Sequence, residues 1–245
     1  MIRKNAFIFI LLLVNITCAK AQTDSLLLNF HKINNTNLRL DAAFDIAKKY
    51  VSTSPDTAIK YLGIALADSA KAENKASVGN CLNGLSVAYF YLANAELSGK
   101  YALQAIHVFK QINDAEGLNK ARKNYALSLE TIGKFEEAIG IYFETLNFFM
   151  ANMDTMRITG TLNDIGNIYI KTKNYTQALY YQHKALGFLQ GNEISTQTKG
   201  NTLNSIGFIY DDMSLKDSAI YYYKQALAIK KKGGGRVKEL MTTVG

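Results

Sequence analysis

Residues 162–169, Leu-Asn-Asp-Ile-Gly-Asn-Ile-Tyr, return 41 positions later as residues 203–210, Leu-Asn-Ser-Ile-Gly-Phe-Ile-Tyr. A weaker copy lies upstream at residues 82–89, Leu-Asn-Gly-Leu-Ser-Val-Ala-Tyr. In all three the apolar residues are three and four positions apart, which marks one face of an amphipathic helix. The chain is therefore expected to repeat one helical unit several times.

Small residues recur at a fixed spacing along the chain, after each of these helices. They are spaced by 40, 40, 40 and 41 residues: Ala58, Ser98, Ala138, Ala178 and Ala219. The helices of the opening motif carry small residues of their own, at Ser86, Ala126, Gly166 and Gly207. Small side chains let two helix axes approach closely, and a fixed period of this length indicates a solenoid. We predict an all-α chain in which antiparallel helix pairs stack as an α-solenoid.

These units resemble tetratricopeptide repeats (TPRs), with a bulky residue, Leu-Gly, Tyr and Ala at the relative places of that family. The resemblance covers residues 39–245 and implies a right-handed TPR superhelix. The period exceeds the usual ~34 residues of the family and resembles its extended variants of 40 to 42 residues. We predict five units, and their approximate bounds are 39–78, 79–118, 119–158, 159–199 and 200–237. The sequence departs from the family at Gln182, where an aromatic residue is usual, and at Arg122.

The two ends of the chain differ from this array. Residues 1–21 read as a signal peptide: Arg3 and Lys4 precede a short apolar run, and Ala19-Lys20-Ala21 has the small-x-small form of a cleavage site. A lipoprotein signal at Cys18 is the less favoured alternative. Residues 22–38 form a lead-in to the array. At the other end, residues 238–245 are either the start of a sixth unit, which would make the chain the front of a longer protein, or a C-terminal cap.

Composition narrows the classes of function. The chain has 245 residues, 48% of them hydrophobic, and a net charge of +8, which falls to +5 when the three basic residues of the signal peptide are removed. The basic residues are scattered, whereas nucleic-acid binding needs them gathered on one face. Cys81 would be the only cysteine of the mature chain, so no intramolecular disulfide is expected, and we interpret Cys81 as a small apolar residue of a helix.

No pattern of catalysis is present. The three histidines, His31, His107 and His183, do not have the i, i+4 spacing of a helical metal site. Gly233-Gly234-Gly235-Arg236 lacks the ending of a phosphate-binding loop. We therefore expect no enzyme activity, no metal and no cofactor, and we assign about half of the clustered tyrosines to core packing.

A binding face is expected on the first helix of each unit, because in stacked TPR units these helices line the concave side. Asparagine suits such a face, since one amide can pair with both the C=O and the N–H of an extended peptide. Lysines on it would favour an acidic group of the ligand, and phenylalanines would add apolar pockets. The alternative is that the asparagines only keep this face soluble. The candidate residues are Asn80, Asn83, Lys120, Lys123, Asn163, Asn167, Asn201, Asn204, Phe90 and Phe208.

These features together favour a non-catalytic scaffold that binds a protein or an extended peptide. The signal peptide places it outside the cytoplasm, in the periplasm or on the outer side of the inner membrane. An alternative is a sensory input region, because the chain resembles the extracytoplasmic TPR regions of two-component histidine kinases and related regulators. The oligomeric state and the ligand are not indicated by any pattern.

Overall fold

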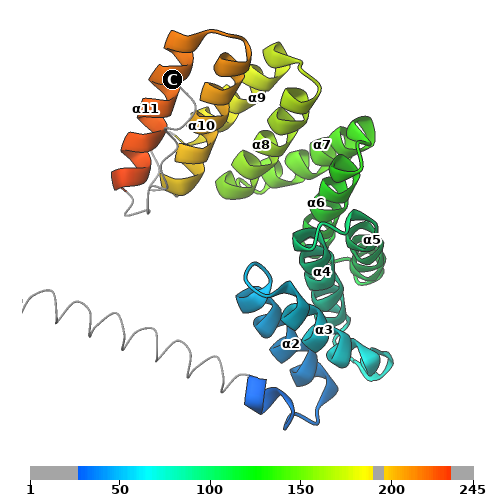
Figure 1. Cartoon of the computed structure of the whole chain (residues 1–245). Helices are drawn as coiled ribbons and strands as arrows, with labels where there is room; N and C mark the ends of the chain where they lie inside the picture. The colour runs from blue at the N-terminus through cyan, green and yellow to red at the C-terminus, as the bar shows by residue number, and fades with distance from the viewer. Residues whose placement is uncertain (1–26, 190–195, 233–245) are drawn as a thin grey trace, which may run out of the picture. The chain divides into compact units, whose positions relative to one another are not determined.

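The computed structural model describes residues 27–189 and 196–232, and every regular element in these residues is helical (Figure 1). No β-strand occurs in this described part. The α-helices are, in chain order, α2 (Thr36–Tyr50), α3 (Pro55–Ala67), α4 (Lys75–Tyr91), α5 (Ala95–Gln111), α6 (Ala115–Thr131), α7 (Phe135–Ala151), α8 (Thr155–Lys171), α9 (Tyr175–Phe188), α10 (Thr196–Asp212) and α11 (Lys216–Lys232). A single 3₁₀ turn, η1 (Ser69–Lys71), follows α3. The predicted all-α fold is confirmed.

Lengths of helix and turn account for the period of the sequence. From α4 to α8 each helix has 17 residues and each connection has three. Two such helices with their two connections occupy 40 residues, which is the spacing seen between the small residues. The longer step of 41 falls where the segment 190–195, outside the described residues, joins α9 to α10.

Each three-residue connection ends one helix and begins the next by the same device. Its middle residue has a positive φ, between 52° and 80°, at Ala93, Asn113, Gly133, Met153, Lys173 and Ser214. The following N–H then bonds back to a carbonyl five residues earlier, as from Asn174 to Tyr169 at 2.8 Å, which is the Schellman pattern. In four of the six connections an Asn or Asp side chain next caps the new helix, as Asn174 does by accepting from the Gln177 N–H.

The chain divides into two compact units, residues 1–128 and 129–245, with the division inside α6. Within the first unit, α2 packs on α3, and α4 packs on α3, α5 and α2. Its core is formed by buried residues such as Leu40, Ile46, Leu62 and Leu85. Within the second unit α8 packs on α7 and α9, and α10 packs on α9 and α11. Consecutive helices are therefore paired in each unit.

The small residues picked out by the period are all buried. This holds for Ser86, Ala126, Gly166 and Gly207 on the first helices and for Ala58, Ser98, Ala138, Ala178 and Ala219 on the second. The contact is close, since a Cβ added to Gly207 would lie 2.7 Å from Cδ1 of Tyr223. In α4 and α5 the two small residues are serines, whose hydroxyl oxygens are 3.4 Å apart. A larger side chain at these seams would separate the helices.

Several predictions concern residues that the structure does not describe. The signal peptide, residues 1–21, and the segment 238–245 lie outside the described residues. First helices begin at Lys75, Ala115, Thr155 and Thr196, ahead of the expected unit bounds at 79, 119, 159 and 200, and the division into five units stays a prediction. Among the described helices, none combines the length and apolar character that a membrane span requires.

Candidate functional site

The expected binding face divides into two groups, one in each compact unit. In the first unit α2 packs beside α4, and α4 is hydrogen-bonded to α6; in the second unit α8 packs beside α10. First helices are thus neighbours within each unit, which places their exposed positions in rows. We call these rows the first-helix face. Its first-unit group is Asn80, Asn83, Phe90, Lys120 and Lys123, and its second-unit group is Asn163, Asn167, Asn201, Asn204 and Phe208.

Two of the candidate asparagines bond to the neighbouring first helix. Asn83 Oδ1 accepts from Asn124 Nδ2 at 2.8 Å, which ties α4 to α6. Asn163 Nδ2 donates to Thr202 Oγ1 at 2.9 Å, which ties α8 to α10. Each amide carries two donor hydrogens and a carbonyl oxygen, so both keep capacity for a ligand. Asn83 and Asn163 therefore also hold adjacent repeats together, a role that the sequence pattern did not reveal.

The remaining asparagines are less engaged. Asn201 Oδ1 accepts from Gln197 Nε2 at 3.1 Å, one turn earlier on the exposed side of α10. By contrast, the side chains of Asn80 and Asn204 make no hydrogen bond to any described residue. Both are half-buried, so their amides lie at the surface of the first helices. Asn80 and Asn204 are the members of the face best placed to bond to a ligand.

Gln182, which replaces the usual aromatic residue, reaches this face from the second helix. It is fully buried in α9, against Gly166. Its Nε2 lies 3.4 Å from Asn167 Oδ1 and 3.5 Å from the Asn163 carbonyl oxygen. A phenylalanine at this place could make neither contact, because its ring carries no N–H or O–H donor. The departure from the family pattern thus links α9 to the asparagines of α8.

The lysines and phenylalanines of the face fit the expectation unevenly. Lys120 already forms an ion pair with Glu116, with 2.7 Å between Nζ and Oε1, and Lys123 is also engaged by another described residue. Phe90 is half-buried, and its ring lies edge-on to Tyr91. Phe208 leaves 48% of its surface exposed. A ligand would therefore contact exposed apolar surface at Phe208, whereas the charge of Lys120 is already paired with Glu116.

The tyrosines form repeated stacks between paired helices. Near-parallel rings, with centroids 5.4 to 5.5 Å apart, join Tyr89 to Tyr101, Tyr169 to Tyr181, and Tyr210 to Tyr222. Burial, and then the neighbouring tyrosine, raise the pKa of Tyr89, Tyr181 and Tyr222 above its ordinary value. Their neighbours Tyr180 and Tyr221 are exposed. One tyrosine of the pair 180–181 and two of the run 221–223 therefore serve packing.

A buried charge joins three helices of the second unit. Glu130, at the end of α6, is only 7% exposed. It accepts a hydrogen bond from the Tyr142 hydroxyl at 3.2 Å and pairs with Lys171 Nζ at 2.8 Å. Burial, followed by the charges of Asp164 and Glu130, raises the pKa of Tyr142, so this hydroxyl stays protonated and donates. This cluster adds a buried polar contact to the α6–α7 pair, whose small seam residues are Ala126 and Ala138.

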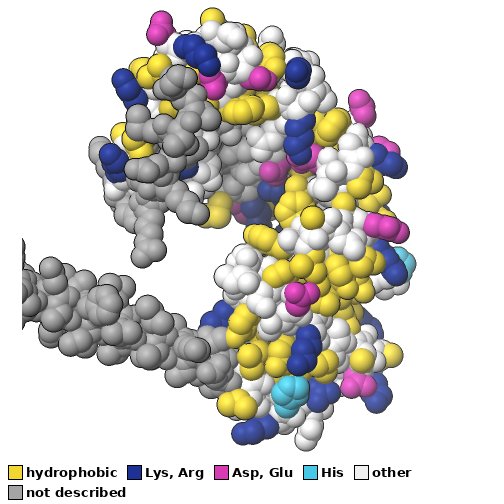
Figure 2. Space-filling model, viewed as in Figure 1, with side chains coloured by type: hydrophobic (Ala, Val, Ile, Leu, Met, Phe, Trp, Pro, Cys, Tyr) yellow, Lys and Arg dark blue, Asp and Glu magenta, His cyan; other side chains and the backbone are white. Residues whose placement is uncertain are grey.

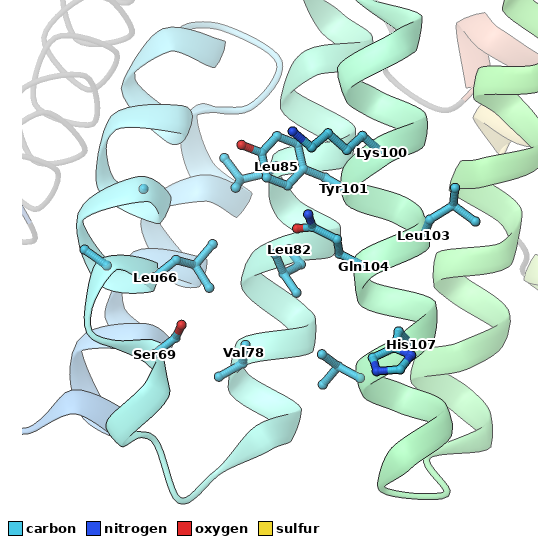
Figure 3. Close-up of a pocket in the computed structure, with 13 residues that line it drawn as sticks. Leu66, Ser69, Val78, Leu82, Leu85, Lys100, Tyr101, Leu103, Gln104 and His107 are labelled. Carbon is cyan, nitrogen blue, oxygen red and sulfur yellow. The ribbon is translucent and has the colours of Figure 1, made fainter.

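An apolar groove, which sequence reasoning missed, lies between the second helices α3 and α5 of the first unit and has α4 as its floor (Figure 3). Its volume is about 820 Å³. We call it the α3–α5 groove, and it is lined by Gly63, Leu66, Ala67, Ser69, Val78, Leu82, Leu85, Lys100, Tyr101, Leu103, Gln104, His107 and Val108. Lys100 and Tyr101 lie at one end, and Val78 and His107 at the other (Figure 3). The apolar residues that line it have the same sequence spacing as core residues. Only the packing of the helices shows that their surface is open.

Metal and thiol chemistry find no support among the described side chains. No group of three His, Cys, Asp or Glu residues in residues 27–189 and 196–232 is close enough to hold a metal ion. Cys81 is fully buried, and its Sγ donates to the Leu40 carbonyl at 3.2 Å. Burial, with a smaller contribution from Asp41, raises the pKa of this thiol to about 12. Cys81 is therefore an unreactive core residue.

Comparisons with known proteins agree with this architecture. The tetratricopeptide repeat family matches residues 157–232. Among solved structures, BtubC (BKLC) from P. vanneervenii superposes with a TM-score of 0.70 at 15% identity, over 94% of this chain and 95% of that chain. The sequence has no match among curated proteins.

Two further similar structures hold bound factors. A Rap protein complexed with competence and sporulation factor has a TM-score of 0.76 at 15% identity, over 88% of this chain and 60% of that chain. NprR in complex with its cognate peptide NprX has a TM-score of 0.68 at 16% identity, over 89% and 63%. At these identities the likeness concerns the fold alone. The chain thus has the all-α fold of TPR-like helical solenoids, and its residues 157–232 match the tetratricopeptide repeat family.

Proposed function

We propose that this protein is an exported, non-catalytic scaffold that binds an extended polypeptide on its first-helix face. The observation that carries the proposal is that each unit has on its first helices an asparagine whose amide makes no hydrogen bond to a described residue, Asn80 in the first unit and Asn204 in the second. A surface amide offers a donor and an acceptor together. It can therefore pair with the backbone of a peptide of almost any sequence.

Relatives of the fold support a polypeptide as the ligand. The similar Rap structure is a complex with competence and sporulation factor, and the similar NprR structure is a complex with a peptide. The apolar surface of Phe208, one turn beyond Asn204 on α10, would contact a ligand side chain while the amide bonds to its backbone. Such a site holds the peptide mainly by its main chain and tolerates changes in its sequence.

Calorimetric titration with a pool of short, unstructured peptides of random sequence tests this proposal. We expect the double substitution Asn80→Ala/Asn204→Ala to weaken binding, because it removes amides that do not hold the fold together. Asn152→Ala is the matched control, since Asn152 is an exposed asparagine outside the first-helix face and bonds only to the Phe148 carbonyl of its own chain. Equal affinity of the double variant and the control would refute the proposal.

Backbone recognition has its own test. A peptide with every second backbone nitrogen methylated loses donors but keeps its side chains. We expect this peptide to bind more weakly than the unmodified one, by ~1 kcal/mol for each hydrogen bond lost. Unchanged binding would show that side chains, and not the main chain, are recognised.

Export is the second part of the proposal, and it is supported by the signal-peptide pattern of residues 1–21. N-terminal sequencing of the protein recovered from the cell envelope should begin at Gln22. A protein that keeps Met1 and remains in the cytoplasm would contradict it.

The alternative function, a sensory input region, predicts further repeats and ~20 apolar residues downstream of Gly245. Sequencing the adjoining DNA would test this alternative.

A further inference from the structure

The α3–α5 groove lies on a different side of α4 from the first-helix face. Its floor on α4 is formed by Val78, Leu82 and Leu85, which share one side of that helix because they are three and four residues apart. Asn80 and Asn83 fall between them in sequence and project from the rest of the circumference. A ligand in the groove would therefore leave the first-helix asparagines free.

Chemically the groove is unsuited to an extended peptide. Its floor on α4 carries no hydrogen-bonding side chain, and the polar lining residues, none of them on α4, are Ser69, Lys100, Tyr101, Gln104 and His107. Gln104 lies between the two ends of the groove (Figure 3). An extended segment would bury unpaired N–H and C=O groups on the floor, at ~1–3 kcal/mol for each. A helix bonds its own main chain and presents only side chains. The groove therefore selects a helical partner.

Its dimensions also fit a helix. Lining residues on α5 run from Lys100 to Val108, which corresponds to ~12 Å of helix at 1.5 Å per residue. This is a little over two turns, enough to seat apolar side chains at i, i+3, i+4 and i+7. Figure 2 shows hydrophobic side chains gathered on the visible face of the first unit.

Gly63 allows such a helix to approach closely. It lies inside α3, is exposed, and has no atom within 4 Å of the position that a Cβ would occupy. Ala67, one turn later, is also exposed and also lines the groove. Glycine inside a helix costs ~1 kcal/mol relative to alanine, and packing within the described chain does not offset this cost. A backbone that comes close to α3 would offset it.

Charge identifies the partner further. Lys100 lines the groove at one end, and no Asp or Glu lines it. His107, at the other end, is a neutral polar group, because its Nε2 accepts from Gln111 Nε2 at 2.9 Å. Lys60 on α3 and Lys110 on α5 are exposed on the same two helices. The acidic residues of these helices, Asp56 and Glu96, lie in their first turns, before the lining residues. Asp68, which caps the end of α3, is ion-paired with Arg39 and Lys71. Acidic side chains flanking an apolar stripe would complement this rim.

From these observations we infer that the α3–α5 groove binds an amphipathic helix of a partner protein, whose apolar stripe of leucine-like residues is flanked by Asp or Glu. This site is separate from the first-helix face and does not depend on the function proposed for it. The scaffold would thus hold two polypeptides, one extended and one helical.

Three synthetic peptides test this inference by fluorescence anisotropy with the full chain. The first has leucines spaced three and four apart and glutamates on its flanks. In the second, lysines replace the glutamates, and in the third a central proline prevents the helix. We expect the first peptide to bind and the other two to bind at least about tenfold more weakly. Equal binding of all three, or no binding of the first, would overturn the inference.

Two substitutions locate the site. Gly63→Leu fills the groove, and we expect it to raise the Kd of the glutamate peptide about tenfold or more. Gly140→Leu is the matched control, because Gly140 is a helix-interior glycine with the same open space but lies in α7, outside the groove. Lys100→Glu, on the rim, should reverse the preference between glutamate and lysine peptides. Identical affinities of the Gly63→Leu and Gly140→Leu proteins, each shown folded by circular dichroism, would refute the location.

Discussion

Gly207 and Gly63 are both glycines inside helices, yet they lie in regions that use glycine in opposite ways. Gly207 is in the seam between α10 and α11, where a Cβ would lie 2.7 Å from the Tyr223 ring. Gly63, like Gly140 and Gly187, is on the outer surface of a second helix, with nothing within 4 Å. In the seam, the close helix approach offsets the poor helix propensity of glycine. On the outer surface no contact with a described residue offsets it, and of these three glycines only Gly63 lines the α3–α5 groove.

The largest expected change in stability is in the α10–α11 seam, where Gly207 contacts the rigid ring of Tyr223. Gly207→Ala should lower the free energy of unfolding by ~2–3 kcal/mol, because the new methyl group meets ring atoms of Tyr223 close to its backbone. Urea denaturation followed by circular dichroism measures this loss. An alanine protein as stable as the parent would show that the α10–α11 seam can widen freely.

The next effect concerns the polar seam of α6, α7 and α8. Glu130→Ala should cost ~2 kcal/mol, because the buried Tyr142 hydroxyl loses its acceptor. The ion pair adds little, since half of the Lys171 side chain is exposed. Glu137→Ala is the control: this exposed carboxylate pairs with Lys134 at 3.1 Å, and its loss should cost less than ~0.5 kcal/mol. Equal losses in the two variants would refute a structural role for Glu130.

A smaller loss of stability is expected in the α8–α9 seam, where Gly166 contacts the flexible side chain of Gln182. Gly166→Ala places its methyl group 2.7 Å from the terminal nitrogen of Gln182, an unbranched side chain that can move aside. We expect a loss of ~1 kcal/mol. A double-mutant cycle with Gln182→Ala should show favourable coupling, since the shortened side chain makes room for the methyl group. Strictly additive losses would mean that the clash lies elsewhere.

The smallest effects have the opposite sign. Gly63→Ala, Gly140→Ala and Gly187→Ala should each raise the free energy of unfolding by ~0.5–1 kcal/mol, because alanine favours the helix and the space is open. Thermal melts of the three variants measure this gain. Destabilisation of any of them would mean that the outer glycines are needed for the fold, and Gly63 would then no longer indicate a bound ligand.

Much of the fold could be predicted from the sequence, because the residues that recur along the chain are the ones that pack the helices together. The copy of residues 162–169 at 203–210 identifies the first helices, and the recurring small residues identify the seams that bury them. The turns were harder to foresee. Five of their six positive-φ residues are not glycine, as at Ala93 and Met153, because the hydrogen bonds that end the helix set this conformation, and residue type does not.

The candidate site was predictable only in part. Periodicity places Asn83 and Asn163 on the right face, but it does not show that they bond to Asn124 and Thr202 on the next first helix. Those partners lie about 40 residues away, and the spacing between helices decides whether they meet. The α3–α5 groove was invisible for a similar reason, since Val78 and Leu82 have the spacing of core residues whether or not another helix covers them.

The central claim, that an extended peptide binds through the first-helix amides, can be tested at the amides themselves. Side-chain NH₂ signals of ¹⁵N-labelled protein, assigned through Asn80→Ala and Asn204→Ala, can be followed during titration with the random-sequence peptide pool. The account predicts that the Asn80 and Asn204 signals shift with increasing peptide, while that of Asn152 does not. Peptide binding that leaves both signals unmoved would contradict it.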